Sequence, residues 1–433
     1  MKKMLPALLA GLCSIALSAG EYRLSELLEL AVRNDNRLEA IHANIAAAET
    51  RKADAYAAYQ PRVSGSAKVS YISEAPSIEI PIPGVPAMSG QNDSYSAALS
   101  VSQLLFGGMA RMKAADLTRN ALSMEMYNGE KRTDELKFLV VQAAYGFRLA
   151  TLSLESLDAS LARLEINKRR VNSFRNQGLA SELDVLEIDG SLDELMLRRA
   201  AQEGEMNRSR IALESLTGAA DISAIVFDGL YLDLSKDTIT AIGQMPVAAN
   251  AELQTIDFAL SAASIRKSLD MAAFYPSAAA FGSLQYGKPG TNSFSDEWEF
   301  YYTGGIEVKM DFWDGGSRFN AIKRDNAKID ELKATKREME SNLDSGKAQN
   351  IQVLIALERQ YDSARSLHKT REEKYEIIQR LWQAGQKTTL DVLAAEQELT
   401  EAELMQKQLE IRRLSKYQDV LKLINRPVWK TQE

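Results

Sequence analysis

The feature that most constrains the fold of this chain is a nine-residue motif that occurs twice. Residues 178–186 read GLASELDVL and residues 385–393 read GQKTTLDVL, an offset of 385 − 178 = 207 residues. The motif begins with a glycine, which can end one helix, and continues with a serine or threonine that can cap the next helix. An aspartate three residues after that cap completes a capping box. The sequence therefore predicts an internal duplication with a tight helix–turn–helix in each half.

Long stretches without proline surround both copies of the motif. Residues 87–245 and 290–426 contain no proline and are rich in alanine, leucine, glutamate, lysine and arginine, which favour helices. Apolar residues recur every three or four positions, as in a narrow coiled-coil seam. Two segments, 108–177 and 317–384, are each long enough for a helix of about 100 Å. A soluble coiled-coil protein would carry the same stripes, so these helices alone identify no function.

Two shorter segments, 61–106 and 276–313, alternate between apolar and polar residues as antiparallel strands do. The predicted return strand of the second hairpin runs on through Met310 and Phe312. The alternation fits the two sides of a membrane barrel, but an ordinary half-buried sheet has the same pattern. Four strands cannot close a barrel, and an open sheet edge cannot lie in lipid. Strands that span a membrane would therefore be pooled by several chains, and three copies would supply twelve.

The N-terminus has the order of a secretory signal peptide. Two lysines precede an apolar run from Met4 to Leu17, which three small residues follow. We predict a signal peptide over residues 1–20 and an exported protein. Cys13 invites a lipoprotein interpretation, but Leu12 stands where a lipoprotein signal needs a small residue.

The composition argues against several classes of protein. A net charge of −7 disfavours a nucleic-acid partner, because such proteins usually carry a basic surface. One cysteine and two distant histidines, His42 and His368, cannot build a disulfide framework or a usual metal centre. The sequence contains no Walker or Rossmann glycine motif and no catalytic constellation. We therefore predict that the chain is not an enzyme and holds no metal or cofactor.

The motifs divide the chain into two repeats of helix, β-hairpin, long helix, tip turn and helix. The predicted parts are a signal peptide (1–20), a first repeat (21–218) with its hairpin (61–106) and first tip turn (177–182), an inter-repeat segment (219–250), a second repeat (251–426) with its hairpin (276–313) and second tip turn (384–389), and a C-terminal tail (427–433). The inter-repeat segment and the tail are expected to form a small equatorial region.

This organisation resembles the TolC family of outer-membrane efflux and secretion channels over the whole mature chain. The resemblance is carried by the paired tip turns, by Pro61 and Pro276 before the hairpins, and by the glycine pairs 107–108 and 315–316 after them. It implies a mainly α fold with β-hairpins. In that fold, long coiled-coil helices form a periplasmic α-barrel, and four strands per chain contribute to a trimeric, 12-stranded outer-membrane β-barrel.

The resemblance also implies a function and a set of partners. The expected function is a passive exit duct of a tripartite efflux or type I secretion system, with a gated periplasmic tip. Its place would be the outer membrane of a Gram-negative bacterium, extending into the periplasm. The expected partners are two further copies of the chain in a homotrimer, outer-membrane lipid, a periplasmic adaptor (membrane fusion) protein and an inner-membrane pump of the RND, ABC or MFS type.

Four residues match gate positions of the family. Asp391 matches a carboxylate that rings the pore constriction, and Trp382 falls where a constriction-lining aromatic is found. Lys387 stands at the position of an arginine that bonds across to the other repeat, and Asp184 matches its acidic partner. Where relatives carry a second aspartate, this chain has Ala394. Without the resemblance, both aspartates could simply cap helices and Lys387 could simply be solvated.

The tip turns are also the surfaces on which the resemblance places the adaptor. The expected docking residues are Gly178, Leu179, Ala180, Ser181, Gly385, Gln386 and Thr388. Two other functions stay open at this point. A periplasmic adaptor also has a long helical hairpin, though normally one and without lipid-suited strands, and an exported coiled-coil structural or adhesive protein would need no paired tip turns.

Overall fold

The computed structural model describes residues 20–75, 77–78, 88–227, 236–427 and 429. Several predicted features lie outside these residues: the signal peptide apart from Gly20, Cys13, and most of the C-terminal tail. Part of the loop of the first hairpin and part of the inter-repeat segment lie outside them as well.

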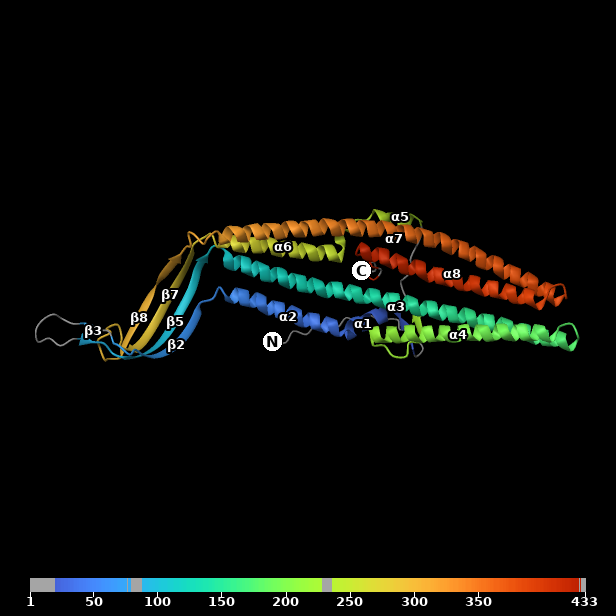
Figure 1. Cartoon of the computed structure of the whole chain (residues 1–433), viewed down its shortest axis with the longest axis horizontal. Coiled ribbons are helices and arrows are strands. Elements are labelled where there is room, and N and C mark those ends of the chain that lie inside the picture. Colours follow the sequence, from blue (N-terminus) through green and yellow to red (C-terminus); the bar gives the residue numbers. More distant parts are fainter. Residues whose placement is uncertain (1–19, 76, 79–87, 228–235, 428, 430–433) are drawn as a thin grey trace, which may run out of the picture. The chain divides into compact units, whose positions relative to one another are not determined.

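The chain is mostly helical, which confirms the predicted fold class (Figure 1). The two longest helices, α3 (Ala110–Asn176) and α7 (Ser317–Gln383), have 67 residues each. At 1.5 Å per residue, each is about 100 Å long. The other helical elements are α1 (Leu24–Asn34), α2 (Asn36–Ala57), α4 (Glu182–Thr217), α5 (Lys236–Gln244), the short 3-10 helix η1 (Val247–Ala249), α6 (Ala251–Ala272) and α8 (Thr389–Leu423).

The order of elements repeats along the chain. The series α2, β2, β5, α3, α4 is followed by α6, β7, β8, α7, α8, and the matching helices have nearly equal lengths. Helices α2 and α6 have 22 residues each, and α4 and α8 have 36 and 35. The residue boundaries assigned to the two repeats stay a prediction.

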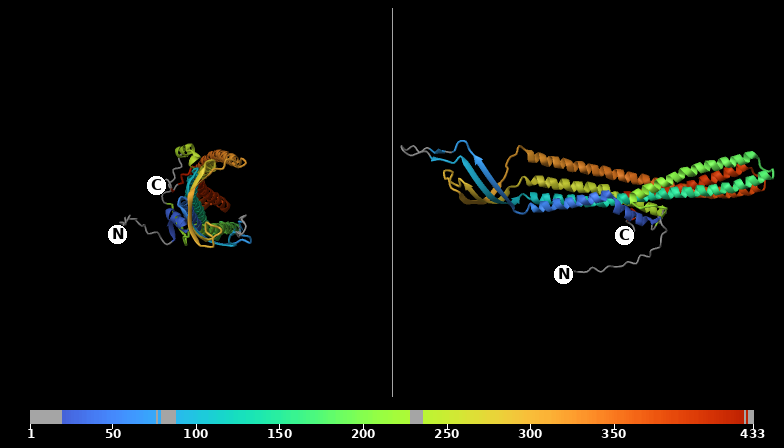
Figure 2. Two further views of the ribbon diagram at one scale, coloured as in Figure 1. Left: turned by 90° about the vertical axis from the view of Figure 1, so that its left-hand side faces the viewer. Right: turned by 90° about the horizontal axis from the view of Figure 1, so that it is seen from below.

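The two hairpins join into one antiparallel sheet with the strand order β2-β5-β7-β8, which Figure 2 shows from two further directions. Its strands are β2 (Arg62–Tyr71), β5 (Asp93–Gly107), β7 (Ser277–Lys288) and β8 (Glu299–Lys309). The predicted extension of the last strand through Met310 and Phe312 is wrong. Strand β7 begins at Ser277, which pairs with Lys309, so residues after Lys309 have no partner strand.

The sheet has an apolar face and a polar face, and its apolar side chains are open to solvent in the single chain. The large residues of the apolar face are Val63, Val69, Tyr71, Tyr95, Leu99, Val101, Leu284, Tyr286, Phe300, Tyr302, Ile306 and Val308. Their exposed fractions run from 37% for Tyr95 to 78% for Tyr302. Such a surface needs an apolar environment or a partner to cover it.

Two small sheets complete the secondary structure. Strand β1 (Glu21–Arg23) pairs in parallel with β6 (Ala224–Val226), and β3 (Ser77–Ile78) pairs with β4 (Met88–Ser89). Across the described ranges, none of the helices combines the length and the apolar character needed to cross a membrane.

The chain forms two compact units, and each takes residues from both repeats. One comprises residues 1–40, 129–251 and 339–433, and the other comprises residues 41–128 and 252–338. The sheet belongs to the second unit. Both tip turns belong to the first, where α3, α4, α7 and α8 surround a core. The members of this core are Val171, Ile188, Tyr375, Trp382, Val392, Ala395 and Leu399.

Candidate gate at the two tip turns

The two tip turns have the same backbone geometry. Gly178 and Gly385 both have φ of +73°, a left-handed conformation that costs a residue with a Cβ about 1–2 kcal/mol. The N–H of Leu179 donates to the carbonyl of Phe174 at 2.8 Å, and the N–H of Gln386 donates to that of Leu381 at 2.9 Å. Both turns therefore end their long helix with a Schellman motif, which glycine makes possible.

A capping box opens the helix after each turn, as the sequence predicted. The Asp184 N–H donates to Ser181 Oγ at 3.2 Å, and the Ser181 N–H donates to Asp184 Oδ2 at 2.8 Å. In the second turn the Asp391 N–H donates to Thr388 Oγ1 at 3.2 Å, and the Thr388 N–H donates to Asp391 Oδ2 at 3.0 Å. Both carboxylates are thus held at helix N-termini, where negative charge is favoured.

Asp391 forms its ion pair within its own turn. The backbone N–H and the hydroxyl of Thr388, and then the ammonium of Lys387, lower the pKa of Asp391. Lys387 Nζ lies 3.4 Å from Asp391 Oδ1, and both side chains stay partly open to solvent. The second tip turn therefore presents a carboxylate whose charge is largely balanced by a neighbouring ammonium.

The groups that lower the pKa of Asp184 come mainly from its own turn. Its pKa is lowered first by the hydroxyl and the backbone N–H of Ser181, and then by the hydroxyl of Thr389. Thr389 is 4% exposed and belongs to the second repeat. Among the ion pairs of the described residues, none joins Lys387 to Asp184, because Lys387 lies one helical turn from Asp391 and pairs there. A contact between Lys387 and Asp184 stays a prediction.

Trp382 lies in the core between the helices and is 4% exposed in the single chain. The resemblance to the family places this side chain at the constriction. Its ring meets that of Phe174 edge to face, with centroids 5.5 Å apart, and the guanidinium of Arg170 lies 5.9 Å from the ring centroid. An indole that fills the core in this way holds α3 and α7 together, and its role at the constriction stays a prediction.

The remaining residues of the tip turns are open to solvent. Leu179 is 72% exposed, and Leu183 and Leu390, just inside the following helices, are 62% and 58% exposed. The turn residues Gly178, Ser181, Gly385, Gln386 and Thr388 are exposed as well, and Ala180 is half-buried. The turns are therefore available for a partner, although the adaptor-docking role of these residues stays a prediction.

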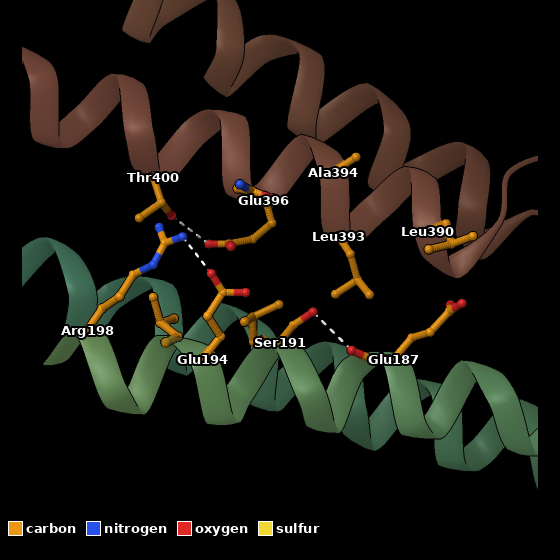
Figure 3. A pocket seen from close by; sticks show the side chains of 12 residues that line it. Glu187, Ser191, Glu194, Arg198, Leu390, Leu393, Ala394, Glu396 and Thr400 are labelled. Atoms are coloured by element: carbon orange, nitrogen blue, oxygen red, sulfur yellow. Dashed lines mark hydrogen bonds and ion pairs between the residues drawn. The ribbon is translucent and has the colours of Figure 1, made fainter. Parts of the chain in front are cut away.

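A hollow of about 340 Å³ lies between α4 and α8, next to the tip turns (Figure 3). Leu390 and Leu393 supply apolar lining, and Glu187 lies on the opposite helix. Arg198 Nη2 donates to Glu194 Oε1 at 2.6 Å on the same wall.

A buried polar network behind this hollow escaped the sequence analysis. Glu396 is 4% exposed and accepts hydrogen bonds from Ser160 Oγ at 2.6 Å, Thr400 Oγ1 at 2.9 Å and Arg163 Nε at 3.2 Å. The network joins α3 to α8 and so joins the two repeats. No local signal marks Glu396, because the polar residues that follow it, such as Gln397 and Glu398, are those that also surround a solvated glutamate.

Within the described ranges, no group of three or more His, Cys, Asp or Glu side chains could hold a metal ion. His42 is exposed on α2. His368 Nδ1 lies 2.7 Å from Gln406 Oε1, a contact between α7 and α8.

Comparison with known proteins finds similarity to outer-membrane efflux and secretion proteins. Residues 244–426 match the family described as outer membrane efflux protein. The chain is 24% identical over 330 residues to the alkaline protease secretion protein AprF of Pseudomonas aeruginosa. That alignment covers 72% of this chain and 65% of AprF, just under two thirds of the relative's length.

Solved structures share the fold at low sequence identity. The outer membrane protein VceC of Vibrio cholerae superposes with a TM-score of 0.75 at 16% identity, covering 94% of this chain and 96% of VceC. The CmeC outer membrane channel of Campylobacter jejuni gives 0.72 at 17% identity, covering 93% of this chain and 85% of CmeC.

Proposed function

We propose that this chain is a member of the TolC family of outer-membrane efflux and secretion channels, and that three copies form a passive exit duct through the outer membrane. The homologues are channel proteins and not enzymes. The protein lies in the outer membrane and extends into the periplasm. Transported material leaves the periplasm, or a pump, through the duct and reaches the exterior.

The observation that carries this proposal is the exposed apolar face of the four-stranded sheet. Tyr302, Ile306 and Val63 are 78%, 69% and 62% exposed in the single chain, and lipid would cover them. Among the residues that the structure describes, no strand pairs with the outer sides of the two edge strands, β2 and β8. Pairing β8 of one copy with β2 of the next leaves no open edge in the bilayer. Three copies supply 3 × 4 = 12 strands.

The duct depends on partners for energy and for delivery. The chain has no nucleotide-binding motif, so an inner-membrane pump of the RND, ABC or MFS type supplies the energy. A periplasmic adaptor docks on the exposed tip turns. Of the two systems, the similarity to a protease secretion protein favours type I secretion, with a polypeptide as cargo.

The tip turns act as the gate. We infer that the hydroxyl of Thr389, which helps to lower the pKa of Asp184, ties the first tip turn to the second. Three Asp391 carboxylates ring the constriction and favour cations over anions. The Lys387 ammonium beside each carboxylate reduces this preference.

Conductance of the purified protein in planar bilayers tests both the duct and the gate. The wild-type protein is expected as a heat-modifiable trimer from the outer-membrane fraction, with a low resting conductance. Thr389→Val keeps the side-chain volume, removes the hydroxyl and should raise that conductance several-fold. Thr370→Val is the matched control, because the Thr370 hydroxyl bonds only the carbonyl of Ser366 in its own helix.

Lys387→Ala tests the ion selectivity of the second tip turn separately from its role in the gate. Removing the ammonium should increase cation preference, measured as a shift in reversal potential, because the carboxylate then lacks its neighbour. A periplasmic adaptor or a coiled-coil structural protein would give neither an outer-membrane trimer nor a conductance. The absence of an outer-membrane trimer, or the absence of a conductance, would contradict the proposed duct.

A further inference from the structure

The polar face of the sheet carries mainly small or charged side chains. Its polar members include Ser64, Ser66, Lys68, Ser96, Ser100, Ser102, Ser283, Gln285, Thr303 and Glu307. Two contacts between side chains show that they share this face: Ser100 Oγ lies 3.2 Å from Ser283 Oγ, and Tyr301 Oη donates to Gln285 Oε1 at 2.6 Å. In the proposed duct this face lines the water-filled lumen.

Phe281 breaks the pattern of that face. It pairs in register with Ser102 on β5 and with Gly305 on β8, so its ring stands on the polar face in mid-strand. Its side chain has no polar atom, and the residue is 46% exposed. Tyr301 is the other aromatic residue on this face within the described strands, and it differs because its hydroxyl is hydrogen-bonded.

The ring of Phe281 lies over a glycine. A Cβ built on Gly305 would be 3.2 Å from Cζ of Phe281, so the ring leans towards β8 and covers the Gly305 backbone. Cross-strand cover of a glycine by an aromatic ring stabilises a sheet. Covering Gly305 explains the contact that one side of the Phe281 ring makes. Nearly half of the residue is still exposed, on a face that is otherwise polar.

We propose that Phe281 is a cargo-contacting residue of the duct. This inference rests on the proposed trimer, in which the threefold axis places the three Phe281 rings at one level of the lumen. There they form an apolar ring that contacts apolar groups of the passing cargo, above all the apolar side chains of an extended polypeptide. An apolar group that touches the ring removes hydrocarbon surface from water on both sides, whereas the serines around it offer no such gain.

Channel block in planar bilayers tests the proposal with two probes of different origin. One probe is an extended neutral peptide that contains phenylalanine, compared with a serine-containing peptide of equal length. The other is tetraphenylphosphonium, compared with tetramethylammonium. Phe281→Ser should weaken block by the apolar probes about tenfold, as expected for the loss of one aromatic contact surface per chain. Block by the polar probes should stay unchanged.

Two further variants keep the test decisive. Phe281→Leu keeps an apolar side chain and should retain block to within about threefold, because a leucine side chain offers nearly the same kind of surface. The double variant Phe281→Ser with Gly305→Thr restores cover for the β8 backbone, so it separates loss of cargo contact from damage to the sheet. It should also lose block, while its heat-modifiable trimer persists.

The outcomes distinguish this inference from the proposed function. A conducting wild-type trimer whose apolar block is the same in both serine variants would overturn the role of Phe281 alone. A wild-type protein that forms no conducting trimer would overturn the duct and this inference together. Loss of peptide block assigns the ring to polypeptide cargo, and loss confined to tetraphenylphosphonium assigns it to small amphiphiles.

Discussion

Replacing Arg163 by methionine tests whether burial or distance decides the strength of an ion pair in this fold. Arg163 lies beside Glu396, whose side chain is 5% exposed, and its Nη2 is 3.1 Å from Glu396 Oε1. Methionine keeps much of the aliphatic stem and removes the positive charge. The carboxylate then stays buried with two hydroxyl donors, Ser160 and Thr400.

The structure gives the size of the expected effect. Breaking a buried ion pair costs about 3–5 kcal/mol, because the remaining charge cannot be solvated. Here the two hydroxyls remain, and the Arg163 side chain is 24% exposed, so water gains some access to the site. We therefore expect Arg163→Met to lower the free energy of unfolding by about 2–3 kcal/mol. If all 433 residues melt cooperatively, the melting temperature falls by about 2–3 °C.

The control is an ion pair whose contact is shorter and whose side chains are more exposed to solvent. Arg198 Nη2 lies 2.6 Å from Glu194 Oε1, and the two side chains are 44% and 64% exposed. Arg198→Met should change stability by less than about 0.5 kcal/mol. Adding Glu396→Gln to Arg163→Met should recover much of the loss, because it removes the orphaned charge. Thermal melts of the purified protein in detergent, followed by helical circular dichroism, measure all the variants; an Arg198→Met shift as large as that of Arg163→Met would refute the argument from burial.

Four further substitutions of single residues test other parts of the fold. Burial, followed by the nearby Asp270, raises the pKa of Asp325, so the folded state favours its neutral form and loses stability as the pH rises through that raised pKa. Asp325→Asn should therefore raise the melting temperature at neutral pH and change it little near pH 3, which a pH series of melts would show; a variant less stable at neutral pH would contradict this. Gly385→Ala should cost about 1 kcal/mol, because its Cβ would meet nothing within 4 Å and only the left-handed backbone is strained. Gly218→Ala should cost clearly more in the same melts, since its Cβ would lie 2.4 Å from an asparagine side chain, and equal shifts would argue against this steric account. Ser181→Ala should cost about 1 kcal/mol and speed amide exchange in the first turn of α4, whereas unchanged exchange would show that the capping box contributes little.

Much of the fold could be predicted because its signals are local. A glycine, a hydroxyl three residues later and a carboxylate three residues after that specify a helix end and a helix start within one short segment. The structure has this geometry in both tip turns. Strand alternation likewise located both hairpins, and it failed only at the end of β8, where the length of the partner strand decides the boundary.

The candidate gate was harder to predict because it depends on how each long helix is rotated about its axis. Successive residues of a helix differ by about 100° in direction, so an apolar stripe does not tell a pore-facing position from a core position beside it. Trp382 is buried in the core, and Glu396 is buried although it is charged and polar residues follow it in sequence. The packing of four helices around one core brought the two tip turns together.

The sequence by itself determined the elements of this protein, their order and the two tip turns, because hydrogen bonds between near neighbours and side-chain periodicity need no distant partner. Only the tertiary structure decided which residues meet across the two repeats. The pairing of β5 with β7 joins strands that lie far apart in sequence, and the network around Glu396 joins α3 to α8. Such contacts depend on register and helix rotation, which packing of the whole chain selects and no short segment encodes.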